Sequence, residues 1–220
     1  MLSRRSIFQT GLALSLLGAN CRREPGQSQQ DGRHAALHAL FAKEWESRLR
    51  ENPLFATSVG RMEWNDKLPE FGLAAAKRSY GFYKTLSASL DGIPTDELGN
   101  ADRISYDVFR AELQRNLDLY EAGGDLMPVN SDSAFHSDFP RIVEDVPLAS
   151  PKDYENLIAR LNAWPRAVDE MVERMREGLK RGFTPPAATM AGFERTAAAH
   201  IVDTPQTSVF DVPFRRFPVG

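Results

Sequence analysis

Cysteine is almost absent from this sequence, and its scarcity limits how the fold can be held together. Cys21 is the single cysteine among 220 residues, so no disulfide can form within the chain. A surplus of basic residues is also missing, because the formal net charge is −3. A protein that binds nucleic-acid phosphates needs a basic face. We therefore expect a fold held by packing alone, and no nucleic-acid partner.

Long hydrophobic runs and catalytic motifs are missing as well. The apolar run at residues 7–17 is interrupted by polar residues, and it is shorter than the ~20 apolar residues that a membrane-spanning helix needs. The sequence has no glycine-rich phosphate loop, no GxSxG nucleophile elbow, no CxxC pair and no HExxH zinc motif. We therefore assign no catalytic residue and predict no metal site within the chain.

The first twenty residues are typical of an export signal. Arg4 and Arg5 precede the apolar run, and the stretch from Ser3 to Phe8 resembles the twin-arginine consensus of proteins that are exported in the folded state. The alternative is an ordinary secretory signal that has two arginines by chance. Changing both arginines to lysine separates the two, because unchanged export of that variant would indicate the general route.

Cys21 stands where a lipoprotein signal places its acylated cysteine, although Gly18 and Asn20 depart from the usual residues before it. We therefore predict a signal peptide at residues 1–20 and treat Cys21 as a candidate site of lipid attachment and membrane anchoring. The protein is then exported, and either periplasmic or membrane-anchored. Residues 21–33 are polar without periodicity and are predicted to be a flexible tether.

From residue 34 to residue 220, apolar residues recur mainly at helical spacing, which predicts an all-α, multi-helix array. We expect a second helix at residues 73–90, and a helix that begins at Ser150-Pro151 and breaks or kinks at Trp164-Pro165. A single last helix opens at residues 184–186. The clearest stripe is formed by Tyr106, Phe109, Leu113, Leu117 and Tyr120.

Residues 125–149 have three prolines and little periodicity, yet several of them are apolar. A long irregular segment inside a compact protein is usually functional or disordered, and the apolar content argues against disorder. We therefore name Asn130, His136 and Ser137 as candidates for contact with a substrate. The alternative is a surface turn of serine and aspartate residues that bond locally.

Two other groups of polar residues are interpreted as surface features. His34 and His38 have the spacing of two zinc ligands on one helix face, but no acidic residue of a zinc motif follows His34, so we interpret them as a solvated pair. A second group alternates in charge and is interpreted as a solvated helix face: Glu170, Glu173, Glu177, Arg166, Arg174 and Lys180.

Two sets of residues resemble motifs of a known family. The first consists of Pro53, Ala56, Thr57 and Gly60, followed by Asp66, Leu68 and Glu70; the second consists of Asp153, Tyr154, Arg160, Leu161, Gly178, Gly182, Pro185 and Pro186. Their order resembles the N-terminal portion of the bacterial DUF885 family, a family of unknown function. Glu70 stands where the family usually has aspartate, and Ala134 where it often has glycine.

The DUF885 family is similar to helical zinc metallopeptidases of the thermostable-carboxypeptidase and oligopeptidase kind. The resemblance implies an HExxPGH-type motif beyond the matched region, with zinc as cofactor and peptides as substrates of the full-length form. We therefore expect the truncated front part of an exported zinc hydrolase, which is inactive alone. Its expected apolar surface, which would favour self-association, contains Val209, Phe210, Phe214 and Phe217. The alternative is a complete small helical envelope lipoprotein that acts as a binding module.

Overall fold

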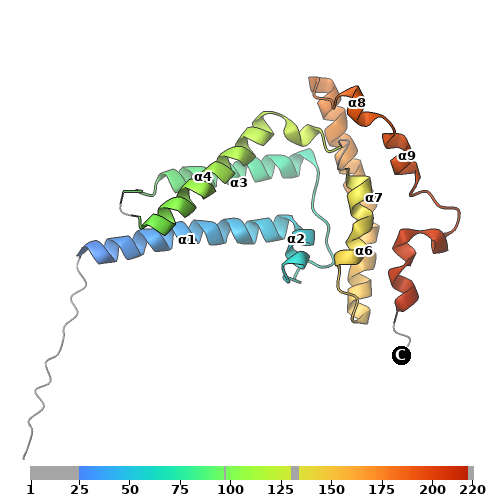
Figure 1. Ribbon diagram of the computed structural model, residues 1–220, viewed down its shortest axis with the longest axis horizontal. Helices are drawn as coiled ribbons and strands as arrows, with labels where there is room; N and C mark the ends of the chain where they lie inside the picture. Colours follow the sequence, from blue (N-terminus) through green and yellow to red (C-terminus); the bar gives the residue numbers. More distant parts are fainter. Residues whose placement is uncertain (1–24, 97, 130–133, 218–220) are drawn as a thin grey trace, which may run out of the picture.

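The computed structural model describes residues 25–96, 98–129 and 134–217, and these residues form an all-α fold (Figure 1). They contain no strand, and Val129 and Ala134 make a single isolated bridge. None of the helices in this part of the chain has an apolar stretch long enough to cross a membrane. The expected all-α fold class is therefore confirmed.

Three long helices lie side by side in the N-terminal half of the molecule (Figure 1). They are α1 (Pro25–Glu51), α3 (Leu73–Asp91) and α4 (Asn100–Glu121). The apolar faces of these helices meet in a core formed by Leu37, Leu86, Leu90, Ile93, Tyr106 and Leu113. The predicted second helix is confirmed as α3, and the stripe predicted on α4 is confirmed because its central members are buried.

Helix α1 begins earlier than the sequence predicts. The tether was expected at residues 21–33, but α1 starts at Pro25, so the structure corrects this expectation for residues 25–33. Proline suits the first helical position, since an N–H there would have no partner within the helix. The glutamines that follow it also have good helix propensity.

Helix α7 (Pro151–Arg181) is the longest helix in the described part of the chain and stands across the ends of the three long helices (Figure 1). At its start, the Asp153 carboxylate accepts a hydrogen bond from the backbone N–H of Ser150 over 2.8 Å. At its end, Gly182 adopts φ +75°, a left-handed conformation that glycine accepts without strain. Both ends of α7 are therefore set by local sequence.

A break or a kink was predicted at Trp164-Pro165. The break is wrong, because α7 continues through Pro165 to Arg181, whereas the kink stays a prediction. Ala167 and Met171 follow the proline and are buried, so the apolar stripe runs on past it. The packing of this stripe maintains the helix although Pro165 lacks the N–H that would bond the preceding turn.

Short helices make up most of the remaining secondary structure in the described residues. The single last helix that we predicted is wrong, because Gly192 has φ +85° and separates α8 from α9. A residue in this left-handed conformation cannot continue an α-helix. The remaining elements are α2 (Pro53–Ser58), η1 (Gly124–Leu126), α5 (Phe135–Asp138), η2 (Phe139–Arg141), α6 (Ile142–Asp145), α8 (Ala187–Met190), α9 (Phe193–Ala198), η3 (Pro205–Thr207), η4 (Val209–Asp211) and η5 (Pro213–Arg216).

The C-terminal segment packs against α7 and the short helices. Phe210 lies 5.6 Å from Phe139 between ring centroids, and Phe214 lies 5.9 Å from the Tyr154 ring. The expectation of exposed apolar surface is therefore wrong for Phe210 and Phe214, which are partly buried. It is right for Val209 and Phe217, which are 40% and 42% exposed. Self-association through them stays a prediction.

Candidate functional site

A buried arginine joins α7 to the segment that contains α2. Arg160 is 1% exposed, and its Nη2 donates to Thr57 Oγ1 over 2.7 Å and to the Pro53 carbonyl over 3.2 Å. Its Nε donates to the Lys67 carbonyl over 3.0 Å. Burial lowers the pKa of Arg160 to about 10, so the side chain stays charged at neutral pH. These bonds fix the α2 segment against α7.

A pocket of about 460 Å³ opens beside Arg160, and we call it the α7 pocket. Its charged side chains are Arg160, Arg174, Asp138 and Asp145. The aspartates are exposed, whereas the arginines are buried or half-buried. Its apolar wall includes Leu54, Leu68, Phe71, Phe135, Phe139, Ile142, Val146, Trp164 and Met171.

Arg174 lines the α7 pocket and has one buried donor without a partner among the described residues. Its Nε is buried and has no hydrogen-bond partner in the described part of the chain. Glu170, one turn earlier, is engaged elsewhere, because it accepts from Arg166 Nη1 and from the Phe71 backbone N–H, each over 2.6 Å. Burial lowers the pKa of Arg174, against the opposing effect of nearby carboxylates. The interpretation of Arg174 as part of a solvated face is therefore wrong.

His136, a predicted substrate contact, lines a second pocket of about 380 Å³, which we call the histidine pocket. His136 Nε2 lies 2.9 Å from Thr196 Oγ1, and that hydroxyl donates to the Phe193 carbonyl over 2.8 Å. A hydroxyl has one proton to give, so Nε2 carries the donated proton and Nδ1 keeps its lone pair. Nδ1 is buried and has no partner in the described residues.

The charge state of His136 follows from its surroundings. Burial, and then the nearby charge of His200, lowers the pKa of His136. The side chain is therefore neutral at pH 7 and presents an acceptor, not a cation. The ring centroids of His136 and His200 are 6.3 Å apart, and both residues line the histidine pocket.

The two pockets share an aromatic wall. Phe139 and Trp164 line both of them, and their rings stack with centroids 3.6 Å apart and planes at 3°. Phe135 also lines both pockets and lies 6.0 Å from Trp164 between centroids. A ligand that displaced this wall would change both pockets at once.

The other predicted residues have different outcomes. Ser137 is exposed and lines neither the α7 pocket nor the histidine pocket. Asn130 lies outside the described residues, as do the export residues Arg4 and Arg5 and the lipidation candidate Cys21. Substrate contact by Asn130, export and acylation therefore stay predictions.

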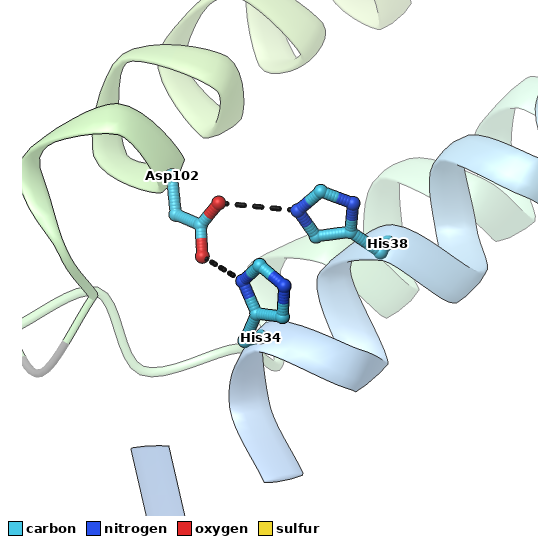
Figure 2. A group of neighbouring side chains, drawn as sticks. All are labelled: His34, His38 and Asp102. Atoms are coloured by element: carbon cyan, nitrogen blue, oxygen red, sulfur yellow. Dashed lines mark hydrogen bonds and ion pairs between the residues drawn. The ribbon is translucent and has the colours of Figure 1, made fainter. Parts of the chain in front are cut away.

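The structure also brings together a group that the sequence did not indicate. His34 and His38 of α1 both hydrogen-bond to Asp102, which lies in the first turn of α4 (Figure 2). Asp102 is 64 residues beyond His38 in the sequence, and an acidic residue in the first turn of a helix is common for local reasons. No local signal could therefore have paired it with the histidines.

Comparison with known proteins identifies the family but no function. A family model described as "Bacterial protein of unknown function (DUF885)" matches residues 53–218. The chain belongs to the DUF885 family. No curated protein matches it. The matched DUF885 region contains every residue that lines the two pockets except Asn52, whereas His34 and His38 lie outside it.

Several residues that carry the DUF885 resemblance have structural roles. Thr57 and Arg160 form the buried hydrogen bond described above, and Gly60 adopts φ +84°. A Cβ on Gly178 would lie 2.7 Å from the Phe183 carbonyl oxygen and 2.9 Å from that of Leu126. Of these residues, Thr57 and Arg160 also line the α7 pocket.

Proposed function

We propose that this DUF885 protein binds an apolar ligand with a carboxylate group in the α7 pocket. One observation carries the proposal: the buried Nε–H of Arg174 has no partner among the described residues and belongs to a side chain that lines an apolar pocket. A buried donor without a partner costs about 1–3 kcal/mol. A carboxylate can accept from Nε and an adjacent Nη together, which is the strong paired geometry of arginine.

The remaining charges of the pocket favour a peptide as this ligand. Arg160 adds a second positive charge to the pocket lining, while Asp138 and Asp145 are exposed and can accept from an amino group or from backbone N–H groups. The apolar wall suits the side chains of a short peptide. A peptide thus supplies each kind of group that the α7 pocket can pair.

A zinc-dependent peptidase role is the finer form of this proposal, and the resemblance to helical zinc metallopeptidases supports it. The α7 pocket would then form part of the substrate-binding wall, while the zinc motif would lie outside this sequence, which has no HExxH. We expect the chain alone to bind peptides without hydrolysing them.

The alternative is a helical envelope protein that acts as a binding module and is not part of a hydrolase. In-frame DNA downstream that encodes HExxPGH would favour the peptidase, and an unrelated gene would favour the module.

Calorimetric titration with short apolar peptides tests the proposal. We expect a peptide with a free C-terminal carboxylate to bind at least about tenfold more tightly than its C-terminal amide, since a charged hydrogen bond contributes about 1.5–3 kcal/mol. Arg174→Gln should abolish this preference. Arg176→Gln is the matched control, because Arg176 is an exposed arginine of the same helix and should leave the preference intact.

Two results would contradict the proposal. One is equal binding of the acid and the amide by the unaltered chain. The other is an unchanged preference in the Arg174→Gln variant, provided that its circular dichroism matches that of the unaltered chain. Either result would remove Arg174 as the contact for a carboxylate.

A further inference from the structure

Two imidazoles and one carboxylate converge where the first half of α1 meets the first turn of α4 (Figure 2). His34 Nδ1 lies 2.5 Å from one Asp102 oxygen, and His38 Nε2 lies 3.1 Å from the other. Each residue offers one ligand atom, and the three atoms lie within 4.8 Å of one another. This group is separate from both pockets, because none of its members lines either of them.

The helices hold the three side chains in this arrangement. Residues four apart on a helix lie on the same face, so α1 presents both rings to Asp102. Packing fixes the two helices close by, because Leu37 of α1 and Tyr106 of α4 belong to one buried core. The ligand atoms are thus brought together by the fold before any ion binds.

The donor set matches the chemistry of zinc and related ions. Imidazole nitrogen and carboxylate oxygen bind zinc at about 2.0–2.2 Å, and three protein ligands with one open position form a common type of site. Ligand atoms of a tetrahedral site with such bonds lie roughly 3.3 Å apart. The 2.5 Å and 3.1 Å contacts end on different oxygens of Asp102, and the ligand atoms lie within 4.8 Å of one another. The side chains must therefore rotate to bring three ligand atoms to that spacing.

The side chains have the freedom and the charge for this change. The His34 and His38 side chains are 60% and 50% exposed, so a small rotation meets little resistance and water can reach the ion. The Asp102 carboxylate already faces both ring nitrogens and supplies negative charge for a cation. On binding, each ring coordinates through the nitrogen that faces Asp102 and carries its single proton on the other nitrogen, so a neutral ring that donates to the carboxylate first exchanges its tautomer through water.

From this geometry we infer that His34, His38 and Asp102 bind one divalent transition-metal ion, with zinc as the representative. The ion joins the first half of α1 to the first turn of α4. It therefore stabilises the folded chain in proportion to its concentration, because the separated residues of the unfolded chain bind it weakly. This site does not depend on the α7 pocket or on a peptide ligand.

Zinc titration of the full chain by calorimetry tests the site. All proteins carry Cys21→Ser, so that the thiol cannot supply a ligand. We expect one zinc per chain and a raised unfolding temperature. His34→Gln, His38→Gln and Asp102→Asn should each weaken zinc binding by at least about tenfold. Asp107→Asn is the matched control, because Asp107 is an exposed aspartate of α4 that pairs with Arg103 over 3.7 Å, and zinc binding should persist.

The possible outcomes separate a metal site from a simple hydrogen-bonded contact. Absence of zinc binding by the Cys21→Ser chain would overturn the inference, and so would full binding by the His34→Gln variant. His34 is the most exposed of the three side chains, so this variant gives a result even if Asp102→Asn disturbs the fold. Circular dichroism of each variant without zinc verifies that the helices are retained.

Discussion

In the half of the molecule formed by α1, α3 and α4, the core joins leucine, isoleucine and tyrosine side chains from three long helices and the turn after α3. Around α7, the buried groups include the charged Arg160 and the main-chain carbonyls to which it donates. The proposed metal group and the proposed carboxylate contact, Arg174, differ in their burial. The metal group lies on the surface of the three-helix half, whereas the unpaired Arg174 Nε is buried beside α7.

The difference has a physical cause. A long helix satisfies most of its own backbone groups, so packing three of them together needs only apolar contacts. The segment between α2 and α3 has carbonyls at Trp64 and Lys67 that lie outside any helix, and Arg160 donates to both. Irregular backbone of this kind also packs less completely, and both pockets lie next to it.

The strongest test of this comparison is Arg160→Gln. The shorter, uncharged side chain loses the buried hydrogen bonds to Thr57 and to three main-chain carbonyls, and we expect the free energy of unfolding to fall by about 4 kcal/mol. Urea unfolding measures the change. Arg176→Gln, at an exposed position of α7, should stay within about 0.5 kcal/mol of the unaltered chain. A loss below about 1 kcal/mol in Arg160→Gln would show that these bonds do not hold the α7 half together.

Leu86→Ala probes the three-helix half by the same measurement. Leu86 is 0% exposed in the apolar core, so its truncation should cost about 3 kcal/mol through lost burial and the cavity left behind. Ile104→Ala is the control, since Ile104 is 66% exposed on α4 and should change stability by less than about 0.5 kcal/mol. Similar losses at both positions would contradict the assignment of the core.

Two glycine-to-alanine substitutions, one in each half of the molecule, should change the free energy of unfolding in opposite directions. A Cβ at Gly178 in α7 meets two carbonyl oxygens at 2.7 and 2.9 Å, so Gly178→Ala should destabilise the chain by about 1–3 kcal/mol. A Cβ at Gly81 in α3 meets nothing within 4 Å, so Gly81→Ala should stabilise it by about 0.5–1 kcal/mol. Thermal or urea unfolding of both variants measures these changes in stability. If both variants were stabilised, or both destabilised, the predicted difference in packing between the two glycines would be refuted.

The smallest expected effect is the pH dependence due to His136. Its pKa is lowered in the folded chain, so the unfolded chain takes up this proton more readily. Its contribution to stability is therefore fully present above the unfolded pKa of about 6.5 and is lost as pH falls toward the folded value. Urea unfolding between about pH 7.5 and pH 5 should show a shallower decline in His136→Gln. An identical slope would mean that the ring is solvated.

Much of the helical structure could be predicted because its signals are local. Tyr106, Leu113 and Leu117 recur at helical spacing, and they are buried on α4 as expected. His136 could be proposed as a candidate because it lies in a proline-rich irregular segment, and it does line a pocket. The continuation of α7 through Pro165 could not be predicted, since the burial of Ala167 and Met171 depends on partners elsewhere in the fold.

The sequence by itself determined that this DUF885 protein is all-α, because helical periodicity, capping residues and glycine ends act over a few neighbouring residues. Only the tertiary structure decided which side chains meet. Arg160 finds its acceptors about a hundred residues earlier in the sequence, and Asp102 contacts two histidines that lie 68 and 64 residues before it on another helix. Such pairs depend on how whole helices pack, because no local pattern specifies the distance between residues on different elements.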